Sequence, residues 1–140
     1  MLTRYLALAS VLSLIWTSGC GDSSGPVGSL SGKVTYKGEP VTEGSIVFFN
    51  PETGAAAEAQ LDLDGTYVIE TQVGGLPPGT YQVSISPPEI PDPSTPPNTA
   101  PSMIPKDMPN VPKKYRRRET SDLTVVIHQG ENTYDLDMQD

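Results

Sequence analysis

An alternation of apolar and polar residues with a period of two is the feature of this 140-residue chain that most constrains its fold. It recurs from residue 30 onward, and within each run every second side chain is apolar. The clearest runs are 33–37, 57–63, 81–86, 123–128 and 134–138. Successive residues of a β-strand point to opposite faces, so each run predicts a strand with one buried face and one face in water. No helical period occurs after residue 20.

Turn-forming residues separate these runs. They occupy positions 38–40, 50–54, 64–65 and 77–79. Asp64-Gly65 lies between two alternating runs and predicts a β-hairpin, since both turn positions of the favoured hairpin turn need a positive φ. Ile46-Val47-Phe48-Phe49 is apolar on both sides and predicts a central strand. About seven short strands with turns roughly every ten residues predict an all-β fold, a seven-stranded antiparallel β-sandwich.

Proline interrupts the pattern once. Residues 87–112 hold 10 of the 15 prolines of the chain. Proline donates no hydrogen bond to a sheet and fixes φ, so this stretch is not a central strand. We predict a proline-rich insertion over residues 87–118, between the fifth and sixth strands. We expect residues 88–112 to be mobile and dispensable for stability.

The N-terminal residues predict export. Arg4 precedes an apolar run from Tyr5 to Trp16, and the small residues Thr17-Ser18-Gly19 precede Cys20. This is the layout of a secretory signal peptide, too short for a spanning helix. Its end resembles a bacterial lipobox, although Thr17 stands where Leu is usual, and the resemblance implies that Cys20 carries a lipid. The alternative is an ordinary secreted cysteine. In that case Cys20 would have no disulfide partner within the chain, because it is the only cysteine.

The chain therefore divides into three parts. We predict a helical lipoprotein signal peptide over residues 1–19, a lipidated Cys20 with a flexible tether over residues 20–29, and a β-sandwich domain over residues 30–138. Two or more acyl chains anchor a protein stably, so we expect a membrane-anchored lipoprotein of the bacterial cell envelope, either periplasmic or outward-facing.

Charge narrows the set of partners. Without residues 1–20 the chain has 8 basic and 17 acidic side chains, a net charge of −9. An acidic surface argues against nucleic-acid binding, which needs a basic field. We expect the membrane as partner through the lipid on Cys20, together with an envelope polysaccharide or another envelope protein.

One basic run stands out in this acidic chain. Five of the six residues from 113 to 118 are cationic, namely Lys113, Lys114, Arg116, Arg117 and Arg118. They are the candidate contact with anionic lipid, polysaccharide or protein. The alternative is a solvated loop whose charges balance acidic strands nearby. Tyr115 is in addition the one aromatic residue we expect to be free for carbohydrate binding, because most other tyrosines fall on inward positions.

Several segments together resemble a known family. They are 32–34, 38–41, 44–48, 64–67 and 76–83, and the last of these reads Leu-Pro-Pro-Gly-Thr-Tyr-Gln-Val. The series resembles the carboxypeptidase regulatory-like domain, a transthyretin-like β-sandwich of bacterial envelope proteins. Residues 104–105, 112–115 and 130–132 are similar to small lipoproteins of unknown function that carry this domain. The resemblance implies architectural roles for its residues. Tyr81, at the corner after Gly79, is expected to bury its ring and return its hydroxyl to nearby backbone.

Catalytic and metal chemistry find little support in the sequence. His128 is the only histidine, and the alternation places it outward without a converging nucleophile or carboxylate. The enzymatic transthyretin-like relative, hydroxyisourate hydrolase, uses several histidines and a different C-terminal tail. Asp62 and Asp64 with Gly65 resemble the start of a calcium loop, but the further oxygen ligands are missing. We expect no catalytic residue, no metal and no cofactor.

We therefore expect a non-catalytic, membrane-tethered binding or structural β-sandwich module of the envelope. The alternative is an accessory or catalytic transthyretin-like domain that acts on a small molecule or a polysaccharide. A pocket with convergent polar groups would favour that alternative.

Overall fold

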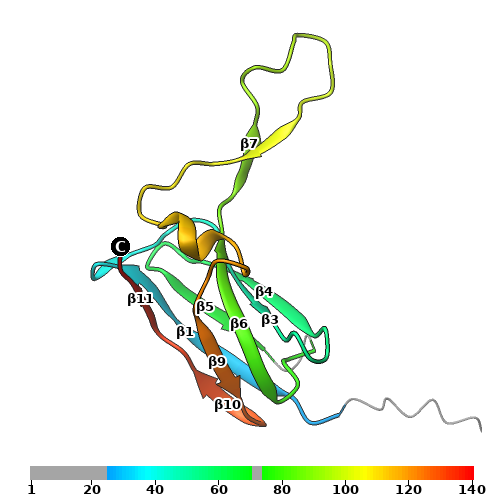
Figure 1. The fold of residues 1–140 in the computed structure, drawn as a ribbon, viewed down its shortest axis with the longest axis vertical. Coiled ribbons are helices and arrows are strands. Elements are labelled where there is room, and N and C mark those ends of the chain that lie inside the picture. The colour runs from blue at the N-terminus through cyan, green and yellow to red at the C-terminus, as the bar shows by residue number, and fades with distance from the viewer. Residues whose placement is uncertain (1–24, 71–73) are drawn as a thin grey trace, which may run out of the picture.

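A computed structural model describes residues 25–70 and 74–140, and Figure 1 shows a sandwich of two β-sheets from which a long arm projects. The predicted signal peptide and Cys20 lie outside the described residues, so their assignment stays a prediction. Among the helices within those two ranges, none is long and apolar enough to cross a membrane.

The first sheet is built around the longest strand, β1 (Gly28–Tyr36). Its partners are β2 (Glu39–Pro40), β5 (Thr66–Ile69), β10 (Gly130–Thr133) and β11 (Leu136–Met138). Strands β2 and β5 run antiparallel to β1, whereas β10 and β11 pair with it in parallel, one after the other.

The two parallel pairings differ from the wholly antiparallel sandwich that the sequence predicts. They arise because the chain changes sheets at this point. Strand β9 (Thr124–Ile127) belongs to the second sheet, and a turn through Gly130, whose φ is +92°, carries the chain across to β1. A strand that enters from the other sheet need not form a hairpin with its new neighbour, and β10 runs in the same direction as β1.

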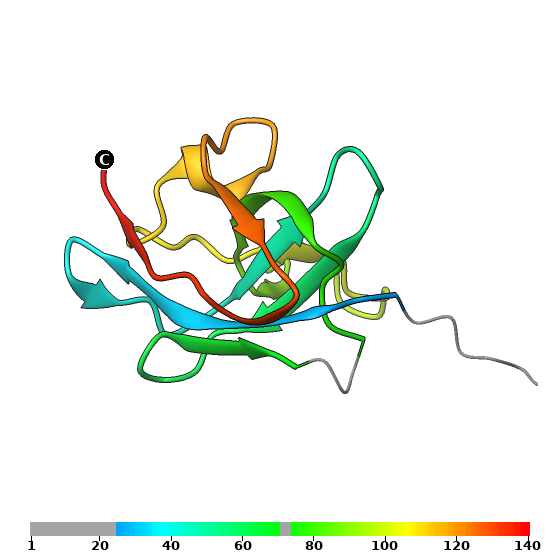
Figure 2. The same ribbon diagram turned by 90° about the horizontal axis from the view of Figure 1, so that it is seen from below.

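The second sheet has the order β4-β3-β6-β9 and is antiparallel throughout. Its remaining strands are β3 (Ser45–Phe49), β4 (Ala56–Gln60) and β6 (Gly79–Ser86). Strand β3 contains the run Ile46–Phe49 and lies between β4 and β6, which confirms the predicted central strand. In Figure 2, seen along the longest axis, β1 and β5 lie in one layer and β3, β6 and β9 in the other. The predicted all-β sandwich is confirmed, with nine described strands in its two sheets where about seven were predicted, and two further strands form a separate sheet.

The turn at Asp64-Gly65 does not close the predicted hairpin. Strand β4 pairs with β3 and strand β5 pairs with β1, so the turn links the two sheets. Only Gly65 has a positive φ, +79°, and its N–H donates to the carbonyl of Asp62 at 2.8 Å. The preceding alternation ends where this turn begins, and Leu63, which was expected inward, is 89% exposed.

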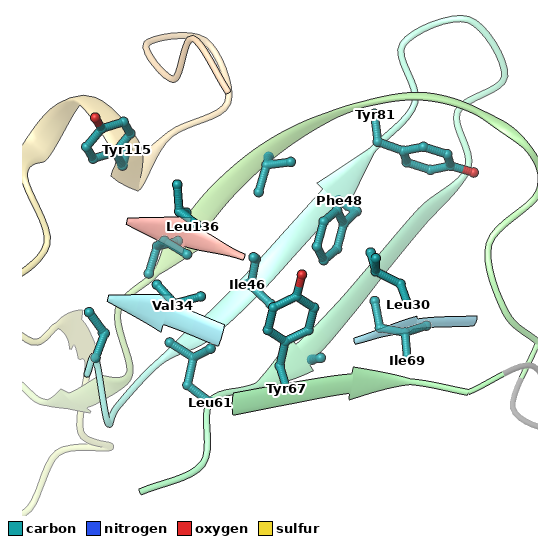
Figure 3. Packing of buried hydrophobic residues seen from close by; sticks show 14 of the residues in the cluster. Leu30, Val34, Ile46, Phe48, Leu61, Tyr67, Ile69, Tyr81, Tyr115 and Leu136 are labelled. Carbon is teal, nitrogen blue, oxygen red and sulfur yellow. The ribbon is translucent and has the colours of Figure 1, made fainter. Parts of the chain in front are cut away.

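The core fills the space between the sheets, as Figure 3 shows. Phe48 of β3 lies at its centre, with its ring centroid 5.8 Å from that of Tyr67 and 6.5 Å from that of Tyr134. Tyr81 is fully buried, and its hydroxyl donates to the carbonyl of Pro77 at 2.7 Å. This contact confirms the predicted tyrosine corner.

Gly32 marks an irregularity in β1 that only glycine fits. A Cβ built at this position would lie 1.9 Å from the carbonyl oxygen of Tyr134, far inside van der Waals contact. The same oxygen accepts a hydrogen bond of 2.7 Å from the Tyr67 hydroxyl. The close approach occurs between β10 and β11, where the parallel pairing with β1 is interrupted.

The proline-rich insertion divides into two parts of different character. The first, residues 87–106, is called the arm below. Strands β7 (Glu89–Pro91) and β8 (Met103–Pro105) pair antiparallel within it, with Ile90 opposite Ile104. Both isoleucines and Met103 are at least one-third exposed. In Figure 1 the arm projects from one end of the sandwich, and the start of β1 lies at the other end.

The second part of the insertion, residues 107–118, is docked on the sandwich and is called the docked part below. Met108, Val111 and Tyr115 are 4%, 0% and 6% exposed and belong to the core cluster. The expectation of a mobile segment reaching residue 112 is therefore wrong for residues 108–112, because their apolar side chains cover core that the two sheets leave open. The expectation that Tyr115 is free for carbohydrate is wrong for the same reason.

Candidate anion-binding site

Residues 113–118, called the basic segment below, are held against the sandwich by contacts at both ends. Its first four residues are the single 3₁₀ turn η2 (Lys113–Arg116), which packs beside β6. The buried ring of Tyr115 anchors η2 to the core. After the segment, the N–H of Ser121 bonds the carbonyl of Arg117 and its hydroxyl donates to the carbonyl of Val83 in β6. The run is therefore fixed at both ends.

Three of its five cations have partners within the protein. Arg116 donates to the carbonyls of Val111 at 2.8 Å and Met108 at 2.6 Å, and pairs with Asp107 at 3.2 Å. Those carbonyls belong to the docked part of the insertion. The Arg116 side chain is only 20% exposed. It therefore ties the basic segment to residues 107–111.

Lys114 and Arg118 point to different neighbours. The Lys114 ammonium donates to the main-chain oxygen of Asp140 at 3.0 Å and lies 4.7 Å from the centroid of the Tyr115 ring. The Arg118 guanidinium lies 4.4 Å from the centroid of the Phe49 ring and bonds Glu119 at 3.0 Å. The pKa of the Glu119 carboxyl is lowered by its own backbone N–H and by Arg118.

Lys113 and Arg117 form no ion pair with any described residue. Both are exposed, and both line a hollow of about 440 Å³ at the base of the arm. The remaining lining residues are Arg116, Thr120, Pro87 and Pro105. Three of the five predicted contact residues therefore meet at one concavity, while Lys114 and Arg118 lie outside its lining.

Three other hollows each have at least two carboxylates in their lining. In the hollow beside Met108, Lys106 forms an ion pair with Glu43. In the hollow along β11, the Asp137 carboxylate accepts the Gly38 N–H and the Thr35 hydroxyl, which lower its pKa. The hollow between β1 and β10 is lined by serine, threonine and two glutamates, with no cation. Of these four hollows, the one at the base of the arm is lined by cations and by no carboxylate.

The alternative candidates from the sequence do not converge on a site. His128 is exposed, and its backbone N–H and carbonyl bond the Asn132 side chain. Asp64 accepts the Thr66 hydroxyl and N–H, which lower the pKa of its carboxyl and serve the turn. Among the residues that the structure describes, no group of three metal-ligating side chains is assembled.

No model of a protein family matches the chain, and neither does any curated protein. Among solved structures, it is similar to a candidate carbohydrate-binding protein from Bacteroides uniformis, with 18% identity and a TM-score of 0.43. It is also similar to the Bacillus anthracis TIE protein, with 16% identity and a TM-score of 0.42. Each alignment covers 81% of this chain, but the chain spans only 41% and 16% of the two proteins.

Proposed function

We propose that this chain is a lipoprotein of the bacterial envelope, anchored by a lipid on Cys20, that acts as a non-catalytic binding module for anionic envelope polymers. The observation that carries the binding role is the hollow at the base of the arm, where Lys113 and Arg117 form no ion pair with any residue that the structure describes, in a chain of net charge −8. Unpaired cations attract anions, and because contacts hold the backbone here, binding orders the two side chains and not the main chain.

The layout of residues 4–20 supports the anchor, since a charged start, an apolar run and small residues precede the lone Cys20. The motifs that resemble the carboxypeptidase regulatory-like domain support an envelope role of the same kind. The position of the arm supports it further. In Figure 1 the arm lies at the opposite end of the sandwich from the start of β1, and Pro87 and Pro105, at the two ends of the arm, line the hollow.

The binding role is tested with the chain from residue 20 carrying Cys20→Ser, which removes the lipid. We expect retention on a resin of immobilised polygalacturonate in about 20 mM salt and release near 200 mM, because counterion screening shortens the range of charge attraction. Dextran, a neutral polymer, serves as the control resin. Failure to bind the anionic resin at low salt would refute the proposed binding function.

A further inference from the structure

The hollow at the base of the arm combines two kinds of surface. Pro87 and Pro105, from the two ends of the arm, supply apolar pyrrolidine rings. Lys113, Arg116 and Arg117 of the basic segment supply cations, and Thr120 supplies a hydroxyl. Its volume of about 440 Å³ lies in the range of small-ligand sites.

The three cations are not equivalent. Arg116 is held by two carbonyls and Asp107, so it is positioned before any ligand arrives. Lys113 and Arg117 have no ionic partner among the described residues, and the fixed position of Arg116 keeps a third charge beside them. Like charges held at one concavity repel one another. An anion that binds there relieves the repulsion between Lys113 and Arg117 and gains an attraction to both, whereas the charge of Arg116 is already offset by Asp107.

Thr120 adds directionality. Its hydroxyl donates to the carbonyl of Lys114 at 2.8 Å, and the carbonyl of Arg117 lies at 3.2 Å from the same oxygen. The proton of this hydroxyl is therefore directed into the protein, and its oxygen lone pairs remain to accept a hydrogen bond from a ligand. A ligand that matches the hollow needs an anionic group, a hydroxyl donor and an apolar face.

We propose that this hollow binds a single acidic sugar of an envelope polysaccharide, a pyranose ring that carries a carboxylate. A guanidinium binds a carboxylate with two parallel hydrogen bonds, a role that Arg117 fills, and Lys113 adds a second charge. The C–H face of the sugar packs on the two prolines, and a ring hydroxyl donates to Thr120. A bare phosphate would leave the apolar walls unused. This inference rests on the proposed binding function and names its ligand class.

The test is calorimetric titration of the same unlipidated chain with trigalacturonate at low salt. The double substitution Lys113→Gln and Arg117→Gln is expected to weaken binding about tenfold or more, since each removes a charge-assisted hydrogen bond. The matched control is Lys114→Gln with Arg118→Gln, which removes the same charge from the same segment outside the hollow. We expect it to weaken binding by about threefold or less, through the general field alone. Melting temperatures identify any variant that fails to fold.

Equal losses in the two double variants would overturn the proposed hollow, while leaving the proposed anionic-polymer binding in place. Retention on the polygalacturonate resin without binding of trigalacturonate would also overturn the proposed hollow, whereas failure to bind the resin would overturn the proposed function. The methyl ester of trigalacturonate keeps the sugar and loses the charge, and it is expected not to bind. Inorganic phosphate and phosphatidylglycerol vesicles are the competing anion sources. Competition by either as effective as that of trigalacturonate would refute a sugar-borne carboxylate.

Discussion

Tyr67 and Tyr81 perform the same task on opposite sides of the sandwich. Each ring is at most 1% exposed, and each hydroxyl donates to a backbone carbonyl at 2.7 Å, that of Tyr134 for Tyr67 and that of Pro77 for Tyr81. A buried phenol stabilises a fold only when its hydroxyl is paired, and both are paired to carbonyls outside regular strands. Each tyrosine thereby fixes a connection as well as filling the core.

Burial raises the pKa of Tyr67 far above its usual value near 10, because the phenolate would lose its hydration. The folded state therefore holds this proton more tightly than the unfolded chain does. The stability that the protonated Tyr67 contributes is complete below pH 10 and is lost as the pH rises toward the pKa of Tyr67 in the folded state. We predict that urea unfolding at pH 11 shows a clear loss of stability relative to pH 8.

The Tyr67→Phe variant separates this effect from other alkaline changes. It should lose about 1 kcal/mol at pH 8, the net value of one hydrogen bond, and then show a shallower decline toward pH 11. Urea denaturation followed by circular dichroism at both pH values provides the comparison. The same slope in both proteins would mean that another group, such as the half-buried Tyr134, carries the alkaline sensitivity.

At this scale the sequence predicts well where local rules hold. The position of Tyr81 after Pro-Pro-Gly defines a corner, so its burial and its backbone bond follow from neighbouring residues. Leu63 and Tyr115 lie in turns, where a period of two no longer assigns a face. Which of them is buried depends on segments distant in sequence. No described segment covers Leu63, which is therefore exposed, whereas η2 places Tyr115 against the core.

For the insertion, too, the sequence predicts what local residues determine and misses the contacts with segments distant in sequence. Its prolines correctly exclude a central strand, and β7 and β8 pair only with each other. That Met108, Val111 and Tyr115 return to the core is not visible in the sequence, because three apolar residues in a polar stretch have no periodicity. The basic segment is likewise evident as a run of charges. Its division into paired and unpaired cations depends on carbonyls and aromatic rings that folding brings near.

The arm and the docked part of the insertion should differ sharply in their effect on stability. Joining Pro91 to Met103 through Asn-Gly removes the tip of the arm and no core residue. We predict a change below about 1 kcal/mol in the free energy of unfolding, because loop-closure entropy varies by only about 0.6 kcal/mol per doubling of length.

Tyr115→Ala is the comparison variant within the same insertion. It should cost about 3–5 kcal/mol, the usual loss for an aromatic residue truncated in a core. Urea unfolding of both variants at pH 7 measures the difference. Comparable losses would mean that the arm belongs to the cooperative unit of the sandwich, contrary to its exposed position in Figure 1.

The start of β1 and the arm lie at opposite ends of the molecule. Strand β1 starts at one end, and its nine residues rise about 30 Å along the sandwich toward the end that bears the arm. Seven residues, 21–27, separate the proposed lipid on Cys20 from β1, and they span at most about 25 Å when fully extended. We therefore propose that the anchor keeps the start of β1 near the bilayer and that the arm, at the other end of the sandwich, extends away from the lipid surface.

This orientation can be measured, because Cys20 is the only cysteine and its thiol is blocked once it carries lipid. A single cysteine introduced as Gly25→Cys or Asn98→Cys then takes one fluorophore, near the anchor or near the tip of the arm. In vesicles with a headgroup-attached quencher, we predict strong quenching at position 25 and little at position 98. Quenching falls steeply over a few nanometres, a distance that the sandwich and the arm together exceed. Equal quenching at both positions would show that the domain lies flat, with its arm on the membrane.

Cys20→Ser in the same background should abolish vesicle binding. If it does not, the lipid is not the anchor and the proposed orientation loses its basis.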